Sequence, residues 1–191
     1  MATTALITEL EVVNSVLSAA GDSPVQTLDS RYQPVFIIKE IIKNISRDMQ
    51  TKKYWFNTER DVTLTPNTQT NKIILPFNIL TFEPEDIRYV ARGLTVYDKE
   101  ARTTNITKDI VATYTVMLDF EELPQQARKY IQAHARVRYN NEYFGELDLK
   151  SDLMKELMEA KNELDRVHME NEDINIFRSA RSYNIAYRNR R

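Results

Sequence analysis

Residues 53–67 read KYWFNTERDVTLTPN and join two parts of the chain that differ in hydrophobic period. Before this stretch, apolar residues recur every three or four positions, as on one face of a helix. After it, β-branched and aromatic residues partly alternate with polar ones, as in strands. Trp55, the only tryptophan, and Phe56 lie at the seam. We expect this aromatic pair to bury apolar area at a domain junction rather than to stack on a ligand.

Two helices are predicted before the seam. The first has an apolar face that repeats from Leu6 to Ala20, and Gly21 follows where a C-terminal cap belongs. The second begins near Pro34, which is tolerated in a first helical turn, and ends near Lys52.

Residues 61–118 have the composition of strands. Runs such as VTLT, KIIL, IRYV and IVATYTVML are separated by Pro, Asn, Gly and charged clusters, which predicts four to six short strands. The ARG sequence at 91–93 favours a hairpin. Pro76 indicates that KIILPFNIL is an edge strand or is interrupted.

Helical patterns return from Pro124 to about Tyr139, break near Gly145, and resume as a near-heptad seam from Leu149 to Val167. Helices and strands that do not alternate indicate an α+β fold. We predict a four-helix bundle from residues 1–54 and 119–173, with a β-rich domain, 55–118, inserted between the second and third helices. An extended C-terminal tail, residues 174–191, completes the predicted architecture.

Composition excludes several kinds of site. The chain has no cysteine, which removes disulfides and thiolate metal sites, and its two histidines lack a metal-motif spacing, so no metal site is predicted. Three isolated glycines cannot build a phosphate loop, so no nucleotide cofactor is expected. The N-terminus lacks the features of a signal peptide, and no apolar run is long enough for a membrane span. A net charge of -2 argues against a generally basic nucleic-acid binder.

Carboxylates offer the only candidate chemistry. The runs FEPED (82–86) and DFEE (119–122) could supply paired acids for glycoside hydrolysis. Acidic surfaces commonly contain such pairs, and acids before a helix stabilise its N-terminus. We therefore expect no catalytic residues and no enzyme, and keep a glycan-degrading hydrolase as an alternative.

The tail is the most distinctive segment. Residues 174–191 hold five arginines and no acidic residue, whereas the rest of the chain has 21 basic and 28 acidic side chains. Arginines between aromatic residues are typical of protein interfaces, although they also suit nucleic acid. Apolar residues such as Ile174 and Ile176 favour a partner protein over DNA. The expected docking residues are Phe177, Arg178, Arg181, Tyr183, Tyr187 and Arg188.

The sequence resembles the tail tubular proteins A, the head-to-tail adaptors of short-tailed bacteriophages. The resemblance runs from about Glu9 to Asn171. It is carried, in matching order and spacing, by EVVNSVLSAAGDSPVQTLD (11–29), WFNTERDVTLTPN (55–67), KIILPFNIL (72–80), YVARGLTVYD (89–98), and DFEELPQQARKYI with NEYFG (119–145).

The resemblance implies a structural adaptor in the virion tail, assembled in the host cytoplasm. Members of this family form a ring of twelve subunits between the portal protein and a tail nozzle protein, and we expect the isolated subunit to be a monomer. The C-terminal segment would dock in the portal. Genomic double-stranded DNA would pass through the lumen during ejection, without sequence-specific contacts and without involvement of a membrane. The alternatives are a tail-associated glycan-degrading hydrolase and a DNA-binding tail component.

Overall fold

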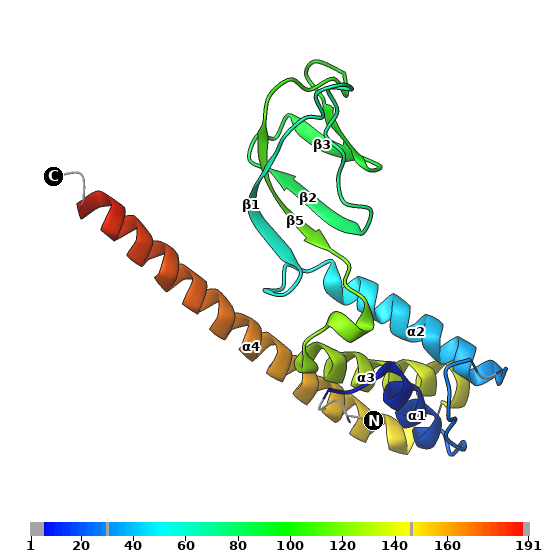
Figure 1. Cartoon of the computed structure of the whole chain (residues 1–191). Helices are drawn as coiled ribbons and strands as arrows, with labels where there is room; N and C mark the ends of the chain where they lie inside the picture. The colour runs from blue at the N-terminus through cyan, green and yellow to red at the C-terminus, as the bar shows by residue number, and fades with distance from the viewer. Residues whose placement is uncertain (1–5, 30, 146, 189–191) are drawn as a thin grey trace. The chain divides into compact units, whose positions relative to one another are not determined.

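The computed structural model describes residues 6–29, 31–145 and 147–188. It divides into two compact units (Figure 1). The helical unit contains the chain up to Ser46 and from Phe120 onward, and the β unit contains Arg47–Asp119. The mixture of helices with small antiparallel sheets confirms the α+β class.

Helix α1, Glu9–Ala19, begins at a reciprocal cap. The Thr8 side chain accepts a hydrogen bond from the Glu11 N–H, and the Glu11 carboxylate accepts one from the Thr8 N–H at 2.7 Å. This capping box satisfies two amide groups that have no partner inside the helix. The helix ends at the predicted place, where Gly21 adopts a positive φ of 76°.

Helix α2, Gln33–Gln50, is amphipathic. Its last residues, from Arg47, belong to the β unit. The buried face within the helical unit consists of Val35, Ile38, Ile41, Ile42 and Ile45. These positions follow the helical spacing that the sequence indicated.

Helix α3, Gln125–Tyr139, packs against both α1 and α4. After α3 the chain continues through a π-helical turn, Asn140–Phe144, to Gly145, whose φ is +67° and whose N–H donates to the Asn140 carbonyl at 2.7 Å. This turn reverses the chain into α4, Leu147–Arg188. The contacts of α3 support a helical assembly around it, and the four-helix bundle itself stays a prediction.

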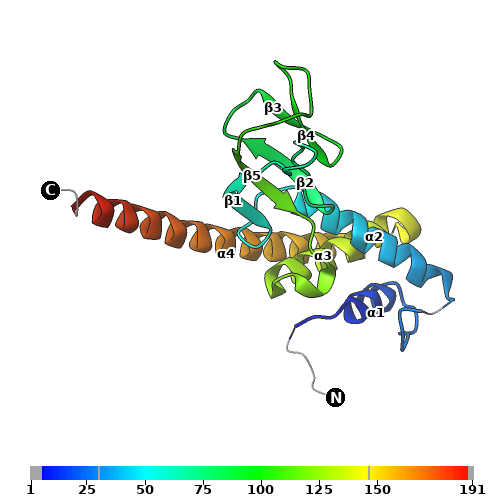
Figure 2. The ribbon, with the colours of Figure 1, turned by 45° about the horizontal axis from the view of Figure 1, so that its top comes forward.

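The expected extended tail is wrong for residues 174–188, which continue α4 as helix. The physical reason is that no Pro or Gly interrupts the sequence between Leu147 and Arg188. Figures 1 and 2 both show α4 running on past α3. Residues 189–191 and the side chains from Asp173 onward lie outside the part of the structure that is described.

The overhang of α4 can be measured from its register with α3. Arg136 forms an ion pair with Glu156, and Lys129 acts electrostatically on Glu163. Lys129 is seven residues before Arg136, and Glu163 is seven residues after Glu156. The two helices therefore run antiparallel. Extended to Gln125, this register reaches Val167. The remainder of the helix, 168–188, would extend about 30 Å at 1.5 Å per residue.

The described β unit has five strands in two antiparallel sheets. The first sheet has the order β1-β5-β2, with β5 in the centre, and the second is the β3-β4 hairpin. The strands are β1 Thr58–Leu64, β2 Ile79–Pro84, β3 Tyr89–Arg92, β4 Thr95–Asp98 and β5 Ile110–Val116. The hairpin predicted at 91–93 is confirmed, and it turns at Gly93 with a φ of +59°.

The segment around Pro76 is interrupted, as its proline indicated. Ile74 makes only an isolated bridge to Thr95, and β2 starts after the proline, at Ile79. Even so, this segment supplies core. The buried cluster of the β unit consists of Ile73, Leu75, Tyr89, Val96, Ile106 and Ile110, with Leu64, Ile79 and Phe82 packed against it.

Candidate functional site

Two buried amide side chains join the first and last segments of the β unit. Gln50 is 0% exposed, and its side chain bonds both backbone groups of Leu118. Asn57, also buried, donates from Nδ2 to the Gln50 carbonyl (2.6 Å) and to the Val116 carbonyl (3.3 Å). These bonds join the chain entering the unit to the chain leaving it. The sequence analysis missed both residues because an amide in a polar stretch carries no periodic signal.

Three consecutive aromatic residues, Tyr54, Trp55 and Phe56, stand in the sequence between Gln50 and β1. Tyr54 stacks on Phe56 with ring centroids 5.4 Å apart, and Trp55 meets Phe56 edge-on at 4.9 Å. Tyr54 is buried, whereas Trp55 and Phe56 are half-buried. Trp55 and Phe56 therefore pack within the β unit, with Tyr54 as a buried partner that the sequence analysis did not name. Their role at a domain junction stays a prediction.

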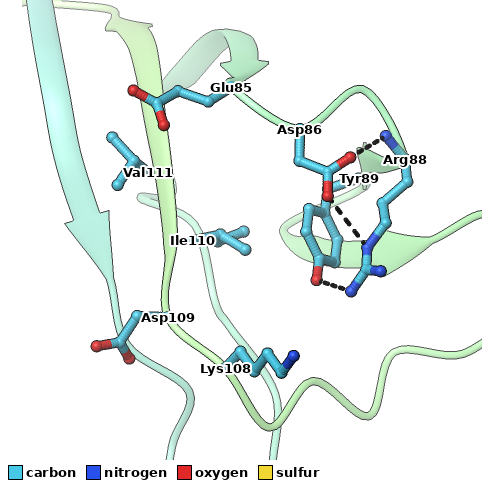
Figure 3. Close-up of a pocket in the computed structure, with 8 residues that line it drawn as sticks. All are labelled: Glu85, Asp86, Arg88, Tyr89, Lys108, Asp109, Ile110 and Val111. Atoms are coloured by element: carbon cyan, nitrogen blue, oxygen red, sulfur yellow. Dashed lines mark hydrogen bonds and ion pairs between the residues drawn. The ribbon is translucent and has the colours of Figure 1, made fainter.

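A hollow of about 320 Å³ opens in the β unit (Figure 3). Its lining comes from the loop between β2 and β3, from the first residue of β3, and from the residues just before and at the start of β5. The residues are Glu85, Asp86, Arg88, Tyr89, Lys108, Asp109, Ile110 and Val111. Two of these acids, Glu85 and Asp86, belong to the FEPED run that was a candidate for catalysis.

Arg88 is held firmly at this hollow. Its guanidinium pairs with Asp86 at 3.4 Å and with Asp98 at 3.5 Å, and it also bonds the Tyr89 hydroxyl. The hydrogen bond with Tyr89 and the neighbouring carboxylates raise the pKa of Arg88. Asp98 in turn accepts from the backbone N–H groups of Glu100 and Ala101, both at 3.0 Å. The charges here stabilise a loop.

Acids of both runs have basic partners or lie apart at the hollow. Figure 3 shows the carboxyl groups of Glu85, Asp86 and Asp109 directed to different sides of the hollow. Glu83 forms an ion pair with Lys53. In the second run, Glu121 lies in the short 3-10 helix η1, Phe120–Glu122, of the helical unit and pairs with Arg128 at 3.1 Å. Both runs thus have structural partners.

Arg128 organises the start of the helical unit. Its side chain is buried, and its Nε donates to the Leu123 carbonyl at 2.8 Å. Nη1 donates to the Ile7 carbonyl at 2.7 Å, and Nη2 bonds the carbonyl of Glu121. One guanidinium therefore fixes the segment before α1 against the segment before α3. Sequence reasoning did not identify Arg128, because its position on the helix is that of an ordinary charged residue.

The two histidines, His134 and His168, lie on α3 and α4. His134 is half-buried and its ring lies 5.6 Å from that of Tyr130. Among the described residues, no group of three or more His, Asp or Glu side chains could hold a metal ion. Within the same residues, no helix has the length and apolar character of a membrane span.

The expected docking residues of the tail lie on the overhanging part of α4. The backbone is helical at Phe177, Arg178, Arg181, Tyr183, Tyr187 and Arg188. Their side chains lie outside the described part of the structure. Their role in docking stays a prediction.

Comparison with known proteins gives a consistent result. The family model for tail tubular proteins matches residues 10–174, which include both units and most of α4. Tail tubular protein A of Klebsiella phage KP34 is 24% identical over 168 residues, which cover 86% of this chain and 88% of that protein. Residues 10–174 contain nearly all of α1, all of α2, the β unit and α3, and the first part of α4. The chain belongs to the tail tubular protein family.

Proposed function

We propose that the protein is a structural adaptor whose copies form a ring between the phage portal and the tail nozzle, as part of the DNA-ejection channel. The observation that carries the proposal is the family match across residues 10–174, which spans both units. Tail tubular proteins are structural components of phage tails, so the coarser role in the tail follows from membership.

The form of α4 supports a role in docking to a second ring. By its register with α3, α4 extends about 30 Å beyond the end of α3, and this stretch includes residues 174–188 of the arginine-rich sequence. A helix that projects from its own unit can enter a cleft of a partner without disturbing the packing behind it. The tail arginines would find acidic or carbonyl groups on the portal.

The charge of the remaining chain suits a DNA conduit. Without residues 174–191, the protein has 21 basic and 28 acidic side chains. A strongly basic lumen would hold phosphates by releasing their counterions, and so slow the passage of DNA. An acidic body keeps the channel from becoming a binding site.

The test is the mass of the purified protein by light scattering, alone and mixed with its portal protein. We expect a monomer alone and a twelve-fold ring on the portal. A protein that remains monomeric beside a well-formed portal would contradict the adaptor role. Release of reducing sugars from capsular glycan by the same preparation would point to the hydrolase alternative. Binding of duplex DNA that weakens steeply with salt would point to DNA binding.

A further inference from the structure

The β3-β4 sheet has one side turned away from the core of the β unit. In the segment 72–75, which borders β4, Ile73 and Leu75 are buried, whereas Lys72 and Ile74 are exposed. Burial alternates in the same way along β4. The buried side supplies the core cluster of the unit, so the other side faces solvent within that unit.

The antiparallel register brings six side chains together on this outward side. Ile74 pairs with Thr95, and Thr95 pairs with Arg92. Val90 pairs with Tyr97, and the register of Ile74 extended by two residues places Lys72 opposite Tyr97. The hairpin face, as we define it, consists of Lys72, Ile74, Val90, Arg92, Thr95 and Tyr97.

The hairpin face is basic and apolar. It contains two cations, Lys72 and Arg92, and none of its six residues is acidic. Asp98, the acid within β4, is buried and belongs to the opposite side of the sheet. Just beyond β4, the exposed Lys99 and Glu100 carry opposite charges. The face itself therefore has a surplus of positive charge.

Arg92 is positioned to receive a carboxylate. Its guanidinium carbon lies 3.4 Å from the centroid of the Tyr97 ring, and this contact restrains the side chain before any partner binds. A restrained guanidinium loses less conformational freedom on pairing with a carboxylate. Ile74 is 61% exposed and Leu94, at the hairpin turn, is 43% exposed. Apolar area beside Arg and Tyr is what the centres of protein interfaces favour.

Duplex DNA would use only part of this surface. Its phosphates would pair with Lys72 and Arg92, but the DNA backbone would not reward burial of Ile74 and Leu94. One side of the Tyr97 ring is covered by Arg92, which leaves less of it for stacking. A protein surface with acidic side chains matches both the cations and the apolar residues.

The helical unit of another copy has the required charge. Outside residues 174–191, this unit contains 18 acidic and 11 basic side chains, whereas the β unit contains ten of each. Ion pairs within the helical unit, such as Arg136 with Glu156, use one charge of each sign, so the acidic surplus remains. Opposite charges steer two surfaces together and fix their register.

We propose that the hairpin face of one copy docks against the helical unit of the next copy, and that this is a side-to-side contact of the ring. The inference rests on the proposed function, because a closed ring needs two different surfaces on each subunit. The hairpin face and the helical unit are separate parts of the chain, so one copy can engage a neighbour on each side. Arg92 and Lys72 pair with carboxylates of the neighbour, and Ile74 is buried at the contact.

Site-specific photocrosslinking tests the contact, because the chain contains no cysteine. Full-length Ile74→Cys protein is labelled with benzophenone maleimide, assembled on the portal and irradiated. We expect covalent dimers and larger multimers, with the label attached to peptides from residues 6–46 or 120–173 of a second chain. The matched control is Thr63→Cys, which is exposed on β1 of the other sheet and should give few multimers.

Charge substitutions give a second measurement. Lys72→Glu with Arg92→Glu should lower the yield of rings on the portal at least tenfold, because two like-charge contacts replace two attractive ones. The control is Lys52→Glu with Lys108→Glu, which makes the same change of charge at exposed positions of the same unit outside the hairpin face. It should keep the yield within about twofold of the parent. Equal yields from the two double variants would overturn the proposal.

The outcomes separate this inference from the function on which it rests. Rings of the expected mass whose Ile74 label attaches to the portal, to the nozzle protein, to DNA or only within its own chain would overturn the contact and leave the adaptor role intact. Complete rings without any crosslink from this position would do the same. Failure of the parent protein to form a ring would overturn both.

Discussion

The side chain of Gln50 replaces a strand partner for Leu118. Its Nε2 donates to the Leu118 carbonyl at 3.0 Å, and the Leu118 N–H donates to its Oε1 at 2.8 Å. The two residues are 68 positions apart, and Gln50 is fully buried. One amide side chain thus holds together the two ends of the β unit.

Replacing Gln50 with leucine should destabilise the β unit by roughly 2–4 kcal/mol, because both backbone groups of Leu118 lose their partner in a buried place. The measurement is urea unfolding followed by the fluorescence of Trp55, which lies in this unit. Gln69→Leu, at an exposed loop position, is the control and should change stability by less than about 0.5 kcal/mol. Similar losses from the two variants would show that the Gln50 bonds add little.

The second prediction concerns the aromatic cluster, where the structure lowers the stability cost expected for Trp55→Ala. From the sequence, Trp55→Ala should cost roughly 3–5 kcal/mol, the value for a fully buried aromatic ring. Trp55 is half-buried and Tyr54 is the buried member, so Tyr54→Ala should now be the costlier change. We expect about 3–5 kcal/mol for Tyr54→Ala and about 1–3 kcal/mol for Trp55→Ala. Thermal unfolding followed by circular dichroism would rank them, and the reverse order would contradict this assignment.

The parts of the fold that sequence predicted are those with a repeating apolar pattern. The spacing from Ile38 to Ile45 and from Ala127 to Val137 marks helices because the same face must meet the core at every turn. Gly21, Gly93 and Gly145 marked chain reversals, since all three have positive φ. The end of α4 was missed because the change to a basic composition after Asp173 suggested a separate tail. The helix continues because no Pro or Gly interrupts it before Arg188.

The polar contacts could not be predicted in the same way. Gln50, Asn57 and Arg128 bond backbone groups of residues far away in sequence. Such pairings depend on which segments the fold brings together, and no local pattern encodes them.

Arg128→Lys should destabilise the helical unit by roughly 2–4 kcal/mol, because an ammonium cannot reach the carbonyls of Leu123 and Ile7 together with Glu121. The readout is the helical circular dichroism signal during thermal unfolding, because most of the helix belongs to this unit. Arg138→Lys provides the control: its ion pair with Glu142 is exposed, and it should shift stability by less than about 0.5 kcal/mol. Equal shifts would mean that the buried fork of Arg128 is dispensable.

Glu9 should make stability depend on pH. Burial raises the pKa of Glu9, the nearby Glu121 raises it further, and Lys39 opposes both. A carboxyl whose folded pKa lies above its unfolded value stabilises the folded state most below the unfolded pKa, and this contribution is lost as pH rises through the folded pKa. Glu9→Gln should therefore gain stability relative to the parent as pH rises from about 4 to 7. A difference between the two proteins that stays constant with pH would contradict the assignment.

Deletion of residues 174–191 separates docking from folding. The register of α3 with α4 ends near Val167, so the shortened protein retains that helix contact and should unfold within about 2 °C of the parent. Association with the portal should be lost, because the deleted stretch contains all five tail arginines and the aromatic residues between them. A variant with Arg178, Arg181 and Arg188 changed to glutamine tests charge alone and should weaken portal binding about tenfold or more, since several charge-assisted hydrogen bonds disappear together. Native gel shift and light scattering with purified portal measure both effects. Full portal binding by the deletion protein would assign the docking surface to another part of the chain.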